Sequence, residues 1–225
     1  MGDAIYNRAD PRWHPQVQSA GLSKRNPSGP GGSSFHFARL WGAADELVAV
    51  ARIWGPSQSV ILSGSNLSKC RLREELARQP SVVHFATHIL EANDQLHTGW
   101  IALSMGKNGL PEFLSPAEIS AYKTNAGLVV LNGCSSGMAE IRTSSGLMGL
   151  TRAWIASGAT GVLATRWPGP DDAGSFFTDF YKELKLSHSK GAAYALRSAC
   201  RRSIAAGGWR AKPEYWASYF LTTID

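Results

Sequence analysis

The chain has 225 residues, of which 44% are hydrophobic and 10% aromatic, enough apolar material for the core of one domain. Its longest apolar runs, at 127–131 and 160–164, are too short to span a bilayer, and the N-terminus lacks the apolar centre of a signal peptide, so we expect a cytoplasmic protein that does not enter a membrane. The net charge of +6 comes from scattered basic residues with one loose group at 201–212, and direct nucleic-acid binding by this domain is therefore not expected.

The chain divides at about residue 38. Residues 1–38 are rich in Gly, Pro, Ser, Asn and Arg, with "SKRNPSGPGGSS" at their centre, and we expect a flexible tail or linker there. From 39 to 225, short apolar runs alternate with amphipathic stretches, which is typical of a sheet flanked by helices.

The pattern of the domain predicts these elements in chain order. Leu47, Val48 and Ala51 share one face of a helix over 43–53, and Asn66 is a candidate N-cap for the next helix, which ends before Pro80. The strands are expected at 59–64, 82–87, 100–104, 127–133 and 160–165, and the remaining helices after Pro116 and at 146–158, 171–185 and 191–206.

Alternation of strands and helices predicts an α/β fold with a mainly parallel central sheet and helices on both faces. We expect the strands 81–87, 127–132 and 160–165 to be central and buried. In such sheets, active groups gather at the carboxyl ends of the strands.

Two of these strand ends carry reactive side chains. "VVHFATH" finishes with His88, and "GLVVLNGC" finishes with Cys134, 46 residues later, which is close to the roughly 50 residues that separate histidine and cysteine in caspases. A thiolate beside an imidazole is sufficient for acyl transfer. The small residues around the thiol leave room for a substrate backbone and offer N–H groups for an oxyanion; they are Gly133, Ser135, Ser136 and Gly137.

Structural interpretations compete with this one. A cysteine after a strand is often a small core residue, and we assign a structural role to His84 inside the strand. Cys70 and Cys200 lie in predicted helices, where packing is expected, and His97 stays an outside candidate for the base. The three cysteines are too few and too dispersed for a disulfide framework and form no CxxC, so we expect free thiols, no metal and no cofactor.

The successive segments "VVHFATH", "LVVLNGCSSG", "GLMGLTRAWIASGATGVLATRWPGPDD", "FYKEL" and "YWASYFL" resemble the motifs of the CHAT domain, a caspase-like module often found after TPR repeats. The resemblance runs from about Leu40 to the C-terminus. "GCSSG" is also similar to the nucleophile segment of separase.

The resemblance implies a caspase-like three-layer sandwich and a catalytic dyad of His88 and Cys134. It also implies an oxyanion site formed by the N–H groups of Ile89, Gly133 and Cys134, and a cleft bordered by the strand that ends at Trp167 and Pro168. The family usually has glycine after the histidine, and the β-branched Ile89 restricts the backbone and is expected to crowd the cleft.

Substrate preference has several candidate determinants. Several caspase-like relatives have an acidic residue just before the nucleophile that helps to select a basic P1 side chain, where this chain has Asn132 and Gly133. Asp94, Asp171 and Asp172 are alternative sources of a negative pocket, to which Ser135 and Ser136 would also contribute. A helix N-cap at Asp171 or Asp172 and a solvated loop at Asp94 explain these residues equally well.

Two functions follow from the resemblance. The first is a cysteine endopeptidase acting on a protein or peptide substrate and gated by a partner protein, a guide complex or a fused repeat domain. The second is a catalytically weak or inactive caspase-like scaffold that binds peptides or partner proteins; Ile89 and the missing specificity acid favour it.

Overall fold

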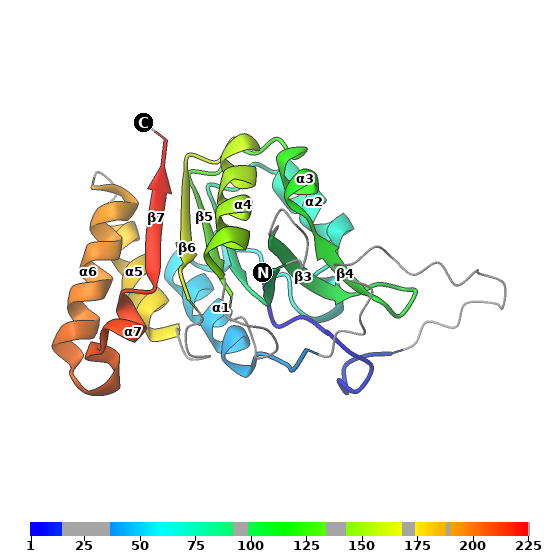
Figure 1. Cartoon of the computed structure of the whole chain (residues 1–225), viewed down its shortest axis with the longest axis horizontal. Coiled ribbons are helices and arrows are strands. Elements are labelled where there is room, and N and C mark those ends of the chain that lie inside the picture. Colours follow the sequence, from blue (N-terminus) through cyan, green and yellow to red (C-terminus); the bar gives the residue numbers. More distant parts are fainter. Residues whose placement is uncertain (15–36, 92–98, 134–142, 168–173, 188–189, 225) are drawn as a thin grey trace.

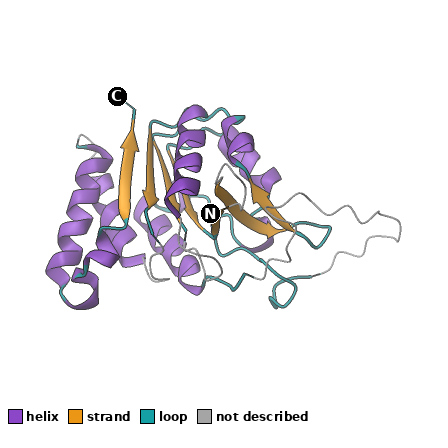
Figure 2. Ribbon diagram, in the orientation of Figure 1, coloured by secondary structure: helices purple, strands orange, loops and turns teal. Residues whose placement is uncertain are grey.

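The computed structural model describes residues 1–14, 37–91, 99–133, 143–167, 174–187 and 190–224 (Figure 1). Over these residues the chain forms a mixed α/β domain in which helices lie beside a twisted sheet (Figure 2). No helix among these described residues is both long and apolar enough to cross a membrane.

The main sheet has four strands in the order β1-β5-β6-β7, formed by Val82–Ala86, Leu128–Asn132, Gly161–Thr165 and Tyr219–Thr223. The first three strands are parallel to one another, and β7 is antiparallel to β6. The sheet is therefore mainly parallel, as predicted. β5 and β6 are interior strands, whereas β1 is the last strand of this order, so the expectation that β1 is central is wrong for the four-strand sheet.

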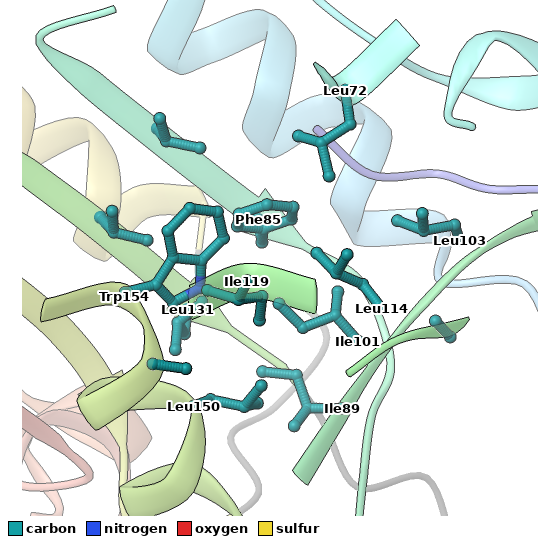
Figure 3. Close-up of a cluster of buried hydrophobic side chains, with 14 of the residues drawn as sticks. Leu72, Phe85, Ile89, Ile101, Leu103, Leu114, Ile119, Leu131, Leu150 and Trp154 are labelled. Atoms are coloured by element: carbon teal, nitrogen blue, oxygen red, sulfur yellow. The ribbon is translucent and has the colours of Figure 1, made fainter. Parts of the chain in front are cut away.

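Side chains of alternate residues in β1, β5 and β6 enter two different hydrophobic clusters, because a strand turns successive side chains to opposite faces. On one face, Phe85 and Leu131 pack with Trp154 of α4 (Thr143–Ala156), as Figure 3 shows. This cluster also takes side chains from α2 (Lys69–Ala77) and α3 (Pro116–Ser120).

On the other face, Val130 and Leu163 join a cluster dominated by the aromatic side chains of α5 (Gly174–Leu186). α1 (Trp41–Trp54), α6 (Gly191–Ala206) and α7 (Pro213–Trp216) add further side chains to it. Both faces of the sheet are thus buried, which explains why β1, β5 and β6 are almost continuously apolar.

A second, antiparallel sheet has the order β2-β3-β4, formed by Ile89–Glu91, Gly99–Met105 and Pro111–Leu114. β2 begins only three residues after β1 ends, so the chain passes from the main sheet into the small one at His88. The sequence pattern predicted β3 but neither β2 nor β4, and it did not predict β7 as a separate strand. The remaining elements are the short 3-10 helices Pro56–Gln58, Gly64–Asn66 and Gly208–Ala211.

Two local predictions are wrong. The segment 59–64 forms no strand: Val60 and Ile61 are exposed, and only isolated bonds, such as Gly2 N–H to the Leu62 carbonyl at 3.1 Å, connect it to the N-terminal residues. The N-cap of α2 is Ser68, whose hydroxyl accepts from the N–H of Arg71, and not Asn66.

The first residues of the segment expected to be a flexible tail belong to the folded domain. Ala4, Ile5 and Tyr6 are at most 3% exposed. The backbone pairs with β1, because Ala86 N–H donates to the Met1 carbonyl at 2.8 Å. Burial of these three side chains outweighs the polar composition around them. Residues 15–36, the centre of that predicted tail, lie outside the described residues.

Candidate active site

His88 follows β1 and is completely buried, with 0% of its surface exposed. Its Nε2 lies 2.8 Å from the carbonyl oxygen of Ala38, which can only accept, so Nε2 carries a proton. In the neutral ring the basic nitrogen is then Nδ1. The contact with Ala38 therefore fixes the orientation of the ring and places a proton on Nε2.

The residues around Ala38 are held in place by the N-terminal segment. Asp3 accepts hydrogen bonds from Arg39 Nε at 2.7 Å and from Arg12 Nη1 at 2.8 Å. The ring of Phe37 lies 5.1 Å from the ring of His88, and the ring of Tyr6 lies 4.6 Å from it in a T-shaped arrangement. His88 is thus enclosed by residues from a segment that precedes it by more than 45 positions.

Tyr6 connects this enclosure to the turn between β1 and β2. Thr87 donates its hydroxyl proton to the Ala102 carbonyl at 2.6 Å, so the hydroxyl of Tyr6, 2.7 Å from Thr87 Oγ1, is the donor in their contact. Burial raises the pKa of Tyr6 to about 12, and the phenol remains protonated at neutral pH. Tyr6 was not among the residues predicted from sequence, because it lies in a stretch of polar composition.

β1 and β5 are adjacent and parallel, and Ala86 is paired with Asn132. His88 and Cys134 each follow a member of this pair by two residues. The described part of this segment continues to Gly133, so Cys134 itself, the predicted nucleophile, is outside the described residues. The pocket candidates Asp94, Ser135, Ser136, Asp171 and Asp172 are outside them as well, and so is Pro168.

Ile89 and Gly133 are in direct contact. A Cβ atom at Gly133 would lie 2.6 Å from Ile89 Cδ1 and 2.9 Å from Ile89 Cβ, too close for any side chain. Ile89 is 7% exposed and points into the cluster that contains Leu150 and Ile101 (Figure 3). The expectation that Ile89 crowds a substrate cleft is therefore wrong: its side chain is a core side chain.

The backbone of Ile89 is positioned by the pairing of β2 and β3. Ala102 N–H donates to the His88 carbonyl at 2.9 Å, and Ile89 is opposite Ile101. Hydrogen-bonded and non-bonded pairs alternate along an antiparallel ladder, so Ile89 is in a non-bonded pair and its N–H points away from β3. The ladder with β3 does not use the N–H group that an oxyanion site would need.

A buried polar network lies beneath the ends of β1 and β5. Glu46 of α1, 3% exposed, accepts from His84 Nε2 at 2.7 Å and from Asn132 Nδ2 at 3.0 and 2.9 Å. The other ring nitrogen of His84 is 2.9 Å from the hydroxyl of Tyr181 on α5. Burial lowers the pKa of His84 and raises that of Tyr181, so both groups are neutral. The predicted structural role of His84 agrees with these contacts.

Glu46, Ala38 and Tyr181 were not predicted from sequence. A glutamate in an amphipathic helix is ordinarily exposed, and nothing in the spacing of α1 marks Glu46 as buried. The only local sequence signal for this network is the histidine in "VVH" together with an acidic residue on a preceding helix. It does not specify which acidic residue is the partner of His84. The carbonyl of Ala38 has no sequence signature at all.

The two described thiols differ from each other. Cys70 is exposed on α2, so the packing role predicted for it is wrong, whereas Cys200 is partly buried and its pKa is raised by burial. Among the described residues, no group of three or more His, Cys, Asp or Glu side chains is arranged to hold a metal ion.

The fold and these contacts define an α/β domain with a buried, oriented histidine at the carboxyl edge of a mainly parallel sheet. The chain belongs to the CHAT domain family, whose model matches residues 5–223. It is also similar to tetratricopeptide repeat protein 28 of Mus musculus, with 26% identity over 227 residues. That alignment covers 83% of this chain but 9% of the mouse protein, so this chain spans a small part of that relative's length.

Proposed function

We propose that this domain is a caspase-like cysteine endopeptidase with His88 as the base and Cys134 as the nucleophile. The observation that carries the proposal is the parallel pairing of Ala86 with Asn132, two residues before each member of the dyad. Membership of the CHAT family supports it. The proposal includes the three-layer caspase-like arrangement, with α4 on one side of the sheet and α1 and α5 on the other.

The orientation of His88 supports the chemistry. With Nε2–H donated to Ala38, Nδ1 takes the proton of the Cys134 thiol, and the thiolate attacks the substrate carbonyl to form a thioester. The imidazolium then returns this proton to the departing amine. Water, activated by the same nitrogen, releases the acid product and restores the thiol.

The backbone near Ile89 supports the oxyanion role. The N–H of Ile89 is directed away from β3, and an isoleucine provides the same backbone donor as the glycine that is usual in the family. Because the Ile89 side chain is buried against Gly133, it does not need to occupy the cleft. Gly133 and Cys134 would supply the neighbouring N–H groups.

Substrate and regulation remain part of the proposal. Asp94, Asp171 and Asp172 are the candidates for a pocket that receives a basic side chain, with Ser135 and Ser136 beside the nucleophile. The similarity to a tetratricopeptide repeat protein supports gating by a fused repeat domain or a protein partner. We therefore expect the domain alone to turn over generic peptides slowly.

Covalent labelling tests the proposal without a known substrate. A peptide carrying a thiol-reactive warhead is incubated with the folded chain, and the labelled cysteine is identified by mass spectrometry. We expect Cys134 to be labelled faster than the exposed Cys70, and the His88→Ala variant to lose this difference. Replacement of the exposed His14 by Ala is the matched control. Equal labelling of both thiols in the unmodified chain would instead indicate a peptide-binding or partner-binding scaffold.

A further inference from the structure

The hydrogen-bond network around Glu46 connects two neighbouring strands near their carboxyl ends, which a contact that only stabilises the fold would not have to do. His84 and Asn132 lie on neighbouring strands, and Glu46 reaches both from α1. Within the pairing of β1 and β5, His84 is opposite Val130 and Ala86 is opposite Asn132. The carboxylate therefore bridges the two strands close to the point where they end.

The direction of every hydrogen bond in the network is determined. A carboxylate only accepts, so His84 Nε2 and Asn132 Nδ2 must both be donors toward Glu46. His84 is neutral because burial lowers its pKa, which leaves its Nδ1 as an acceptor for the Tyr181 hydroxyl. The donors of His84 and Asn132 therefore both point toward one buried carboxylate, and an amide in its place would turn an N–H group toward one of these donors.

Asn132 makes two of the hydrogen bonds to Glu46. Both oxygens of Glu46 accept from its Nδ2, at 3.0 and 2.9 Å, although Asn132 itself is only partly buried. Cys134 is the second residue after it in the chain. The side chain at the last position of β5 is thus held by a carboxylate from α1.

The same helix region also holds the histidine. The carbonyl of Ala38, three residues before α1, accepts from His88, and Leu40, Ala43 and Leu47 pack on Ala86. A single segment, 38–47, therefore contacts the ends of both strands that carry the dyad.

We propose that Glu46 is a positioning residue for the dyad: by holding Asn132 it fixes the end of β5, two residues before Cys134, relative to the end of β1. This inference rests on the proposed function. Asn132 occupies a position that is associated with substrate preference in relatives. In this chain its side chain instead contacts Glu46 inside the protein.

The test measures the alkylation rate of Cys134 by iodoacetamide as a function of pH, with the exposed Cys70 as the internal reference in the same chain. A thiol paired with His88 reacts with a midpoint below that of an ordinary thiol. We expect Glu46→Gln and Asn132→Ala to raise the Cys134 midpoint by about one pH unit, which is about tenfold slower alkylation at pH values well below the midpoint. The Cys70 profile should not change.

Glu75→Gln is the matched control. Glu75 is 6% exposed, accepts from Arg71 and Arg78, and lies on α2 away from β5. Its replacement removes an equally buried carboxylate and should lower the melting temperature without moving the Cys134 midpoint. If Glu46→Gln and Asn132→Ala also lower only the melting temperature, Glu46 has a purely structural role and the inference is wrong.

A charge swap adds a rescue. Asn132→Asp alone places two carboxylates against each other, whereas the Glu46→Gln/Asn132→Asp double variant restores a donor and acceptor pair and leaves the amide oxygen at position 46 for His84. We expect Cys134 to react faster in the double variant than in Asn132→Asp, and strictly additive effects would argue against the contact.

The His88→Ala variant distinguishes failure of the proposed function from failure of the positioning role. If Cys134 in the unmodified chain already has an ordinary midpoint that His88→Ala does not change, the proposed function and the positioning role both fail. If His88→Ala raises the midpoint but the Glu46 and Asn132 variants do not, only the positioning role fails.

Discussion

Ile89 and Gly133 form a contact in which the side chain of Ile89 occupies the space that a side chain at position 133 would need. The nearest side-chain atoms of Ile89 would lie less than 3 Å from a Cβ at 133, including its Cδ1 at 2.6 Å. The residue before the proposed nucleophile is therefore restricted to glycine by a core isoleucine that follows the proposed base.

This contact predicts a size-swap result. Gly133→Ala should destabilise the domain by about 1–3 kcal/mol, because overpacking forces neighbours to shift. Gly133→Ala combined with Ile89→Ala should be less destabilised than the sum of the single variants, as measured by urea unfolding. Gly127→Ala is the control, since a Cβ there meets only the Ser81 carbonyl at 3.5 Å. Additive costs would show that the two side chains do not share this space.

Because the phenol of Tyr6 is buried, we expect the folding stability of the chain to fall at alkaline pH. Its pKa is raised to about 12 in the folded chain by burial, compared with 10.0 for a free tyrosine, so the unfolded chain loses this proton first as the pH rises. The stability that Tyr6 contributes through this shift is fully present below pH 10 and is lost between pH 10 and about 12, on the order of 3 kcal/mol. Denaturant unfolding measured across this range should show a shallower decline for Tyr6→Phe. An unchanged decline would assign the effect to other groups.

His84 predicts the opposite dependence in acid. Burial lowers the pKa of His84 below the ordinary value of 6.5. Between these two pKa values the unfolded chain binds a proton at His84 that the folded chain does not bind. The stability present above pH 6.5 is therefore lost as the pH falls from 6.5 toward the lower folded value. His84→Gln removes the titrating group and should flatten this part of the stability profile, although it is less stable at neutral pH. A profile of the same slope would contradict the prediction.

Phe37 predicts a linkage between the segment before α1 and the proposed base. Phe37 is 8% exposed and contacts the rings of His88 and Tyr6, so Phe37→Ala should cost about 3–5 kcal/mol. The NMR signals of the His88 ring should shift with it, because Ala38 is the next residue. Trp41→Ala is the control: Trp41 is 69% exposed and stacks on Arg39, and its loss should cost about 1 kcal/mol or less.

The buried strands could be predicted because their sequences allow little else. β1, β5 and β6 are strands of five mostly apolar residues, and α5 and α6 have clear helical periodicity. The run at 59–64 has the same composition but leaves Val60 and Ile61 exposed, because no neighbouring strand receives it. Composition indicates a strand and does not indicate its partner.

The positions of His88 and Gly133 could likewise be predicted from the strand ends. The contacts that orient His88 could not, because they come from Tyr6, Phe37 and Ala38, whose local sequence is rich in polar residues and glycine. Glu46 illustrates the same limit: its burial depends on His84 and Asn132, which lie 38 and 86 positions away. From the sequence alone such a residue resembles an exposed acidic residue, because its hydrogen-bond donors lie far away in the chain.

The N-terminal segment also lies along the outer edge of β1. Met1 donates its amino group to the His84 carbonyl at 2.7 Å, Ala86 N–H donates to Met1, and Gly2 and Ala86 form a parallel bridge. The outer rim of β1, which would otherwise present unpaired amides to another chain, is thereby capped. A fragment beginning after Tyr6 would open that rim next to His88, and it would be prone to self-association through strand addition.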